Sequence, residues 1–372
     1  MMTMVEKMIK QMLKKIYTSV IIITFLTIIS CSSGCQSYNN VSKTLFVNTI
    51  AIDYDNESEN FSVYYHMTNP SSLTTASLGG GGNNTSPFSI AKGQGKTIFE
   101  AMELISSNSN KKLKLTHIQA IILTTNYLSY NNLKQFHEFI KTNPNLYSDF
   151  GILVTDSKIE DIFRIADIED ASPYYSIIVS SNDANKSHKI TTFLEFSRNI
   201  TEDYIKLSFP LVRTYEDVWK NQNEKIYSLS IIGDIYINKN NNIIVLTEKE
   251  YPIINIINTD GNTDFSINNI SFFITRHKTN IKQLTESSFK ITINIEAYLT
   301  KYCYINDASA KKILVQELEK SLTEIIKVTK ENNIDLFSVN NILYRKGKLK
   351  NINHYKNVDF VYSFNIKLIS NP

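Results

Sequence analysis

The chain opens its folded part with two runs in which apolar and polar residues alternate with a period of two. Residues 45–52 and 61–67 carry this pattern, and the polar segment 53–56 lies between them. Such alternation, broken by turn-forming residues, predicts a β-hairpin. The next segment, 70–89, is rich in Gly, Asn and Pro, which predicts a surface loop. The first run is apolar at nearly every position, so we expect it to be covered on both faces.

Strands and helices then alternate along the first half. The segments 118–123 and 150–154 are short apolar runs that predict buried strands. Apolar residues at helical spacing follow Thr97, Leu133 and Ser157, and Thr97 lies three residues before a glutamate, which is the spacing of a capping box. Strands that alternate with helices favour a mixed α/β layer in the N-terminal region.

The second half has a different pattern. Strands are predicted over 229–237 and 243–246, with an Asn-rich turn between them, and residues 289–299 alternate over their whole length. A long amphipathic helix follows from Asp307 or Ser309 to about residue 331, and the chain closes on a strand near 358–368. This order predicts an antiparallel sheet packed by one long helix.

The fold class predicted for the whole chain is therefore α+β, with a mixed α/β N-terminal region followed by an antiparallel-sheet C-terminal domain with one long helix. Residues 213–229 are polar, and we expect a domain boundary there. The predicted division is a leader over 1–34, an N-terminal region over 41–212 that can hold one domain or two subdomains, and a C-terminal domain over 228–372.

The N-terminus has the organisation of an export signal. Four lysines precede an uncharged apolar run, 16–29, and two cysteines follow it, Cys31 and Cys35. A helix of that run spans about 21 Å, which is short for a bilayer core of about 30 Å. A cysteine after the apolar run predicts a lipoprotein, whose thiol carries a diacylglycerol. The residues before Cys31 favour it slightly as the lipidated position, so both cysteines stay candidates.

Charge narrows the possible partners. The chain has 39 basic and 36 acidic residues, and the leader accounts for four of the lysines and one glutamate. The rest of the chain is therefore neutral overall, which argues against a nucleic-acid binder and against a polybasic membrane patch.

Catalytic and metal-binding patterns are absent from the sequence. The six histidines are scattered, Cys303 is the one cysteine beyond the leader region, and no Gly-x-Ser-x-Gly elbow occurs. The segment 93–97 resembles the end of a phosphate-binding loop, but the earlier glycine that such a loop needs is replaced by Ile90. We expect a glycine turn that leads into the Thr97 cap. We also expect that the protein needs no cofactor and is not an enzyme.

The chain resembles the Ger(x)C family of spore germination lipoproteins, through short motifs in the family's order that cover most of the mature chain. The matching segments are Gly34-Cys35, Ala51-Ile52-Asp53, Thr68-Asn69-Pro70-Ser71, Gly95-Lys96-Thr97-Ile98-Phe99-Glu100-Ala101, the strand start at His117, Gly233, Leu246-Thr247-Glu248-Lys249-Glu250 and Asp335-Leu336-Phe337-Ser338. The chain departs from the family at Gln36-Ser37, Ala51 and Ser338, where the family has Trp-Asp, Gly and Gly. The family spacing favours Cys35 as the lipid anchor.

The resemblance implies the C subunit of a nutrient germinant receptor, held on the outer face of the spore inner membrane beside A and B subunits. It implies a binding or assembly role and structural roles for Asp53, Gly95, Thr97, Glu100, His117, Gly233 and Glu250. Two other classes remain open from the residues alone. A solute-binding lipoprotein of an importer predicts two similar α/β lobes, and an extracytoplasmic hydrolase predicts a pocket of acids and bases.

Overall fold

The computed structural model describes residues 2–32, 43–68, 88–146, 149–163, 165, 190–202, 205–221, 224–247, 250, 253–258, 263–267, 270–299, 306–348 and 352–369. The chain divides into two units, 1–43 and 44–372. The first unit contains α1 (Met2–Ser32), which includes the four lysines and the apolar run 16–29 of the predicted leader. None of the helices in the described ranges is both long enough and apolar enough to cross a membrane.

The second unit begins with a large mixed sheet, which we call the first sheet. Its strands lie in the order β10-β9-β8-β6-β5-β1-β2-β3, with β4 paired to β1 and β7 to β6. The four central strands β1, β5, β6 and β8 run parallel, and β2, β3, β9 and β10 add to them antiparallel at the two sides. The strands are β1 (Thr44–Asp55), β2 (Asn60–Thr68), β3 (Phe88–Gly95), β4 (Lys112–Lys114), β5 (Ala120–Thr124), β6 (Gly151–Thr155), β7 (Thr191–Thr192), β8 (Leu207–Asn221), β9 (Glu224–Ile237) and β10 (Ile243–Thr247).

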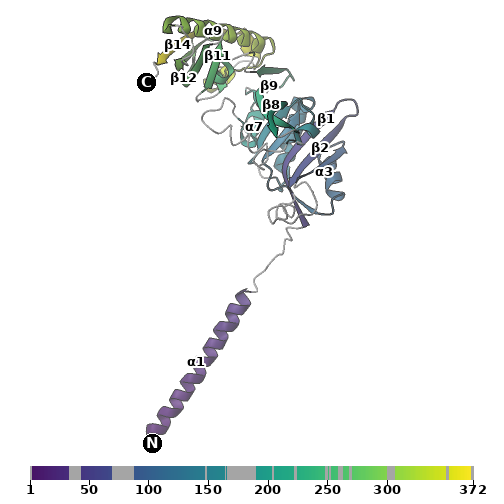
Figure 1. The fold of residues 1–372 in the computed structure, drawn as a ribbon, viewed down its shortest axis with the longest axis vertical. Helices are drawn as coiled ribbons and strands as arrows, with labels where there is room; N and C mark the ends of the chain where they lie inside the picture. Colours follow the sequence, from purple (N-terminus) through teal and green to yellow (C-terminus); the bar gives the residue numbers. More distant parts are fainter. Residues whose placement is uncertain are drawn as a thin grey trace. The chain divides into compact units, whose positions relative to one another are not determined.

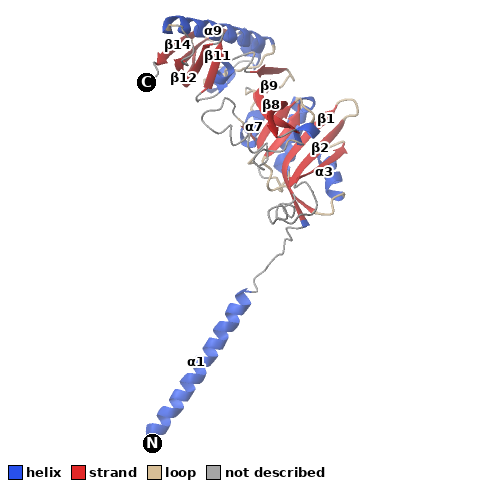
Figure 2. Ribbon diagram, in the orientation of Figure 1, coloured by secondary structure: helices blue, strands red, loops and turns tan. Residues whose placement is uncertain are grey.

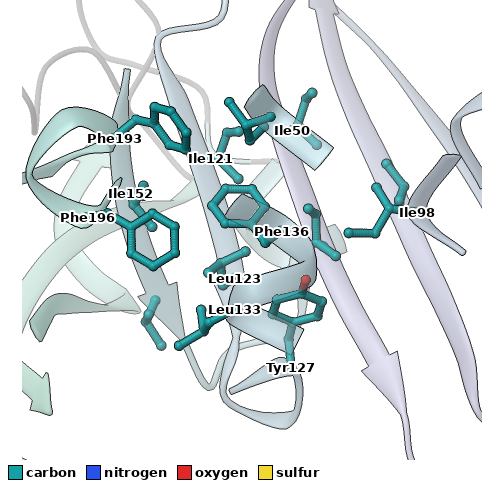
Figure 3. Packing of buried hydrophobic residues seen from close by; sticks show 14 of the residues in the cluster. Ile50, Ile98, Ile121, Leu123, Tyr127, Leu133, Phe136, Ile152, Phe193 and Phe196 are labelled. Atoms are coloured by element: carbon teal, nitrogen blue, oxygen red, sulfur yellow. The ribbon is translucent and has the colours of Figure 1, made fainter. Parts of the chain in front are cut away.

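Helices cover both faces of this sheet. The helices α3 (Ile98–Ser107), α4 (Tyr130–Thr142) and α7 (Phe193–Thr201) share one core with the alternate strand residues Ile50, Ile121 and Ile152 (Figure 3). The short α5 (Ile159–Phe163) packs on the opposite face against a smaller core. Strands buried on both faces explain why the central runs are apolar at every position.

The C-terminal part is a four-stranded sheet, the second sheet, covered on one face by α9 (Asp307–Glu331) (Figures 1 and 2). The apolar stripe of α9 is fully buried in a core with the sheet, with Leu314, Leu318, Leu322 and Ile325 each 0% exposed. The strands are β11 (Thr263–Ile267), β12 (Ile270–Gln283), β13 (Ser288–Leu299) and β14 (Asp359–Ile369), and the helices that accompany α9 are α8 (Ile253–Asn258), α10 (Val339–Arg345) and the short η3 (Ile352–Asn357). Another short turn, η2 (Thr125–Tyr127), follows β5 in the first sheet.

The α+β class, the mixed N-terminal region and the C-terminal sheet with one long helix are confirmed. One detail of the antiparallel prediction is wrong, because β14 joins β13 in parallel. The chain passes through α9 between these two strands, and a long crossover returns it to the end of the sheet where β13 began. Alternation along a strand reports which face is buried and carries no information on direction.

Two local predictions also need correction. The domain boundary predicted at 213–229 falls on the strands β8 and β9, which pair there as a hairpin. As a result β9 and β10, predicted to open the C-terminal domain, belong to the first sheet. The predicted glycine turn at 93–95 is the end of a strand, β3, whose first two residues were expected to be loop. The domain limits 41–212 and 228–372 stay predictions.

Candidate functional site

Three of the motif residues, Gly95, Thr97 and Glu100, meet at the corner between β3 and α3. Thr97 is the N-cap of α3, and its hydroxyl accepts the backbone N–H of Glu100 at 3.1 Å. The Glu100 carboxylate accepts the backbone N–H of Lys96 at 2.8 Å. A Cβ on Gly95 would lie 2.6 Å from the Cβ of Glu100, so the glycine lets α3 start close to the strand. This motif builds a corner and presents no reactive group.

Gly233 and Glu250 lie around β10. Gly233 pairs with Thr247, and a Cβ there would meet the backbone oxygen of Leu246 at 2.4 Å. The hydroxyl of Thr247 donates to the Glu250 carboxylate at 3.0 Å and accepts its backbone N–H at 3.3 Å. The glycine therefore permits close pairing of β9 and β10, and the Thr–Glu pair closes the turn after β10.

Asp53 lies at a small pocket of about 220 Å³, where the parallel strands β1, β5 and β6 reach their carboxyl ends. The hydroxyl of Thr124 donates to the Asp53 carboxylate at 2.5 Å. On the same rim, Nε of Arg213 donates to both carboxylate oxygens of Asp156 at 2.8 Å. The edge where parallel strands end is the usual position of a ligand in open α/β sheets. Here its acidic groups already accept hydrogen bonds from the chain.

The remaining predicted site residues lie apart from these groups. His117 is exposed before β5, and its ring packs edge-on against Phe46 at 5.0 Å between centroids. Cys31 is part of α1, although its side chain is not among those described, and Cys35 lies outside the described residues. The lipid anchor therefore stays a prediction.

The most unusual group of charges lies where the first sheet meets the C-terminal part, and we call it the joint. Lys206, just before β8, reaches across and donates its ammonium proton to the backbone oxygen of Leu336. The neighbouring Asp335 is 7% exposed, and its carboxylate accepts the backbone N–H groups of Val339 at 2.9 Å and Asn340 at 2.6 Å. Asp335 thereby caps the first turn of α10.

Burial governs the protonation of both charged groups in the joint. The stem of Lys206 is partly exposed, but its ammonium group is enclosed and lies 5.4 Å from the ring centre of Tyr236. Burial lowers the pKa of Lys206 to about 8, against the opposing effect of Asp335 and Asp234. Burial also raises the pKa of Asp335 to about 6, although the N–H donors of α10 and the charge of Lys206 oppose the rise.

An Asn-rich turn, 238–242, makes a second set of contacts in the joint. Nδ2 of Asn238 donates to the backbone oxygens of Asn332 and Asn333, each at 3.0 Å, and Nδ2 of Asn242 donates to the same Asn332 oxygen at 2.8 Å. These oxygens belong to the C-terminal end of α9, where carbonyl groups lack helical partners. At its other side the turn accepts the backbone N–H of Tyr130, the first residue of α4, through Oδ1 of Asn241 at 2.6 Å.

A polar pocket of about 260 Å³ lies within the joint, lined by Lys206, Asp234, Ser338 and residues of α7. In the part of the chain that the structure describes, no group of three or more His, Cys, Asp or Glu side chains could hold a metal ion. Lys206 hydrogen-bonds a backbone oxygen across the joint, and Asp335 hydrogen-bonds backbone N–H groups of its own segment. The arrangement therefore fixes one part of the chain against another and offers no paired nucleophile and base.

Sequence reasoning found only part of the joint. Asp335 and Ser338 stood out through a family motif, and the turn 238–242 was predicted as a turn alone. Lys206 and Asp234 were missed because each is a single charged residue beside a strand, with no local pattern. Lys206 and its acceptor Leu336 are 130 positions apart in the sequence, and only the fold brings them together.

Known proteins share this chain's sequence and architecture. Residues 37–214 match the family described as the spore germination protein N-terminal domain. Spore germination protein KC of Bacillus subtilis (strain 168) is 23% identical over 163 residues, which is 42% of this chain and 37% of that protein's length. The crystal structure of the GerBC protein superposes with a TM-score of 0.50 at 15% identity, covering 86% of this chain and 96% of that chain.

These matches define the class of protein. It is a germination-related protein in which a mixed N-terminal sheet is joined to a C-terminal lobe made of a sheet and a helix. Its sequence motifs, the matched N-terminal domain and the shared fold agree on one family. Residues 37–214 carry the spore germination protein N-terminal domain, and the three comparisons together support a Ger(x)C family protein.

Proposed function

We propose that this protein is the lipid-anchored C subunit of a spore germinant receptor, required for nutrient-triggered germination. The observation that carries the proposal is the germination-protein domain over residues 37–214. A fold shared with GerBC over 86% of the chain supports the assignment beyond that domain. The expected partners are the receptor's A and B subunits.

The proposed location is the outer face of the spore inner membrane. The basic start of the leader, its apolar run and the cysteines Cys31 and Cys35 support export and attachment of a diacylglycerol. Family spacing favours Cys35, and the residues around Cys31 favour that position instead. Mass spectrometry of the mature N-terminus distinguishes them, and an intact leader without lipid would contradict the anchor.

We further propose a role in binding and assembly instead of catalysis. Lys206 hydrogen-bonds the backbone oxygen of Leu336 across the joint, and Asp335 caps α10 on the C-terminal side of the joint. The importer alternative predicts two similar α/β lobes, whereas the second sheet has four strands and one covering helix and differs from the first.

Deletion of the gene tests the proposal. Spores that lack this protein should lose germination in response to at least one nutrient, and the intact gene should restore it. Affinity purification of the full-length lipoprotein from spore membranes should recover an A and a B subunit. Unchanged germination with every nutrient, in a strain without a compensating paralogue, would contradict the receptor role.

A further inference from the structure

The second sheet has one face that α9 does not cover. Residues of β13 alternate between buried apolar and accessible polar positions, so that Phe289, Ile291 and Ile293 face the core and the residues between them do not. Strand pairing aligns the uncovered residues of β12, β13 and β14 in rows, and we call basic face the four rows that lie between Phe273-Tyr298-Ile369 at one end and Ser288-Asp359 at the other. The rows are Arg276-Glu296-Lys367, Lys278-Asn294-Asn365, Asn280-Thr292-Ser363 and Lys282-Lys290-Val361.

Short polar side chains tie the middle of the basic face together. Nδ2 of Asn365 donates to Oδ1 of Asn294 at 2.9 Å, and the hydroxyls of Thr292 and Ser363 lie 3.3 Å apart. Small paired side chains of this kind leave the longer lysines and the arginine standing above a level surface. Arg276 and Lys367 are 80% and 72% exposed.

The charges on this face are unbalanced. Its four rows hold five basic residues and one acidic residue, Glu296, which lies 3.9 Å from Arg276 and 3.7 Å from Lys367. One further acid, Asp359, follows in the next row. The neutral net charge of the chain argued against a polybasic patch. Net charge does not show how the charged residues are distributed over the surface.

One pair of lysines on the basic face lowers the stability of the sheet. Lys282 and Lys290 are directly opposite on the antiparallel strands β12 and β13, and both are exposed. Like charges at opposed positions destabilise a sheet. A threonine or glutamate at either position would relieve the repulsion, so stability gives no reason for this pair.

We propose that the basic face docks on a membrane surface that contains anionic phospholipids. Clusters of four to eight basic residues bind such surfaces, at about 1 kcal/mol per Lys or Arg. An acidic protein is the competing partner, but protein interfaces usually need a buried apolar or aromatic anchor. In the four rows the one large apolar side chain is Val361, at the end of the last row, and the partly buried aromatic row Phe273-Tyr298-Ile369 adjoins the first. A level, polar and basic surface fits lipid headgroups better.

This inference takes the membrane setting from the proposed function, but its test does not need the anchor. Residues 44–372 contain both sheets and all three cores, so this unit is expected to fold without the leader. Binding of purified 44–372 is measured by flotation with vesicles of phosphatidylcholine alone and with about one third phosphatidylglycerol. Failure of the receptor role in spores leaves this measurement unchanged, so the two proposals can fail separately.

The decisive variant is Lys290→Glu. It places opposite charges across β12 and β13, so the unfolding midpoint should rise while binding to anionic vesicles falls by about 10-fold or more, since the change both removes a cation and adds an anion. The matched control is Lys311→Glu, which makes the same charge change at an exposed position of α9, in the helix that covers the other face. The control should bind nearly as well as the unchanged protein.

The expected pattern is binding to anionic vesicles at low salt, loss of most binding at about 0.5 M salt because exposed charges are screened, and selective loss in Lys290→Glu. Equal binding to neutral vesicles would overturn the proposal, as would an equal effect of the two substitutions. Absence of vesicle binding by the unchanged protein would also overturn it and leave an acidic protein as the partner of this face.

Discussion

The side-chain amide of Asn238 closes the C-terminal end of α9 by donating to the backbone oxygen of Asn332 at 3.0 Å. Asn238 lies in the turn between β9 and β10, and Asn332 lies at the end of α9, 94 positions further along the sequence. The same side chain accepts the N–H groups of Asn240 at 2.9 Å and Asn242 at 3.1 Å through Oδ1. A single asparagine thus shapes its own turn and holds the C-terminal helix against the first sheet.

Substitution Asn238→Asp separates these two roles. The aspartate keeps an acceptor for the turn, but it loses both donors and brings a negative charge to the negative end of the helix dipole. We expect the free energy of unfolding to fall by about 1–3 kcal/mol, because the partly buried oxygen of Asn333 loses its donor from Asn238 and the oxygen of Asn332 keeps only the bond from Asn242. The control is Asn240→Asp, at an exposed position of the same turn. Equal losses in denaturant unfolding would contradict this role of Asn238.

Ser338 occupies the position where the resemblance to the Ger(x)C family implies glycine. The backbone conformation at this position explains the preference for glycine. Its backbone lies in the left-handed region, at φ 55° and ψ 34°, and its side chain makes no capping hydrogen bond. This conformation costs a non-glycine residue about 1–2 kcal/mol, although glycine gains entropy in the unfolded chain. Ser338→Gly should therefore raise the unfolding midpoint modestly, whereas Ser338→Ala should not. A midpoint that falls in the glycine variant would contradict the strain.

Asp335 should make stability depend on pH in an unusual direction. Burial raises its pKa from 3.8 to about 6 in the folded protein. Between these values the native state holds a proton that the unfolded chain has released, so the contribution of Asp335 to stability falls as the pH rises. Relative to Asp335→Asn, the unchanged protein should lose stability from about pH 4 to about pH 6. Chemical unfolding across that range measures the difference, and a constant difference would contradict the shifted pKa.

The close packing of α3 on β3 depends on Gly93. A Cβ at this position would lie 2.0 Å from the backbone oxygen of Ala101 and 2.9 Å from Cγ1 of Ile105. Gly93→Ala should destabilise the protein by about 1–3 kcal/mol or more, because the helix must move away from the strand. Ser89→Ala, at an exposed position of the same strand, should have little effect. Thermal melts of both variants provide the comparison.

The strongest sequence predictions rested on patterns that many residues repeat. The alternation over 289–299 and the helical stripe of α9 each place a whole set of apolar residues on one side, and burial enforces that pattern position by position. The strand β3 lacked such a pattern because its glycines are selected by contact with α3. Its existence depends on a helix that follows it, which local alternation cannot show.

The sequence by itself determined the order of the main strands and helices and the cap of α3, because each is encoded in residues that lie near one another. Only the tertiary structure decided the parallel entry of β14, the pairing of Lys206 with the Asp335 loop, and the gathering of five basic residues on one face. These relationships join residues far apart in the sequence. Their energies depend on burial and on neighbouring charges, which exist only after the chain has folded.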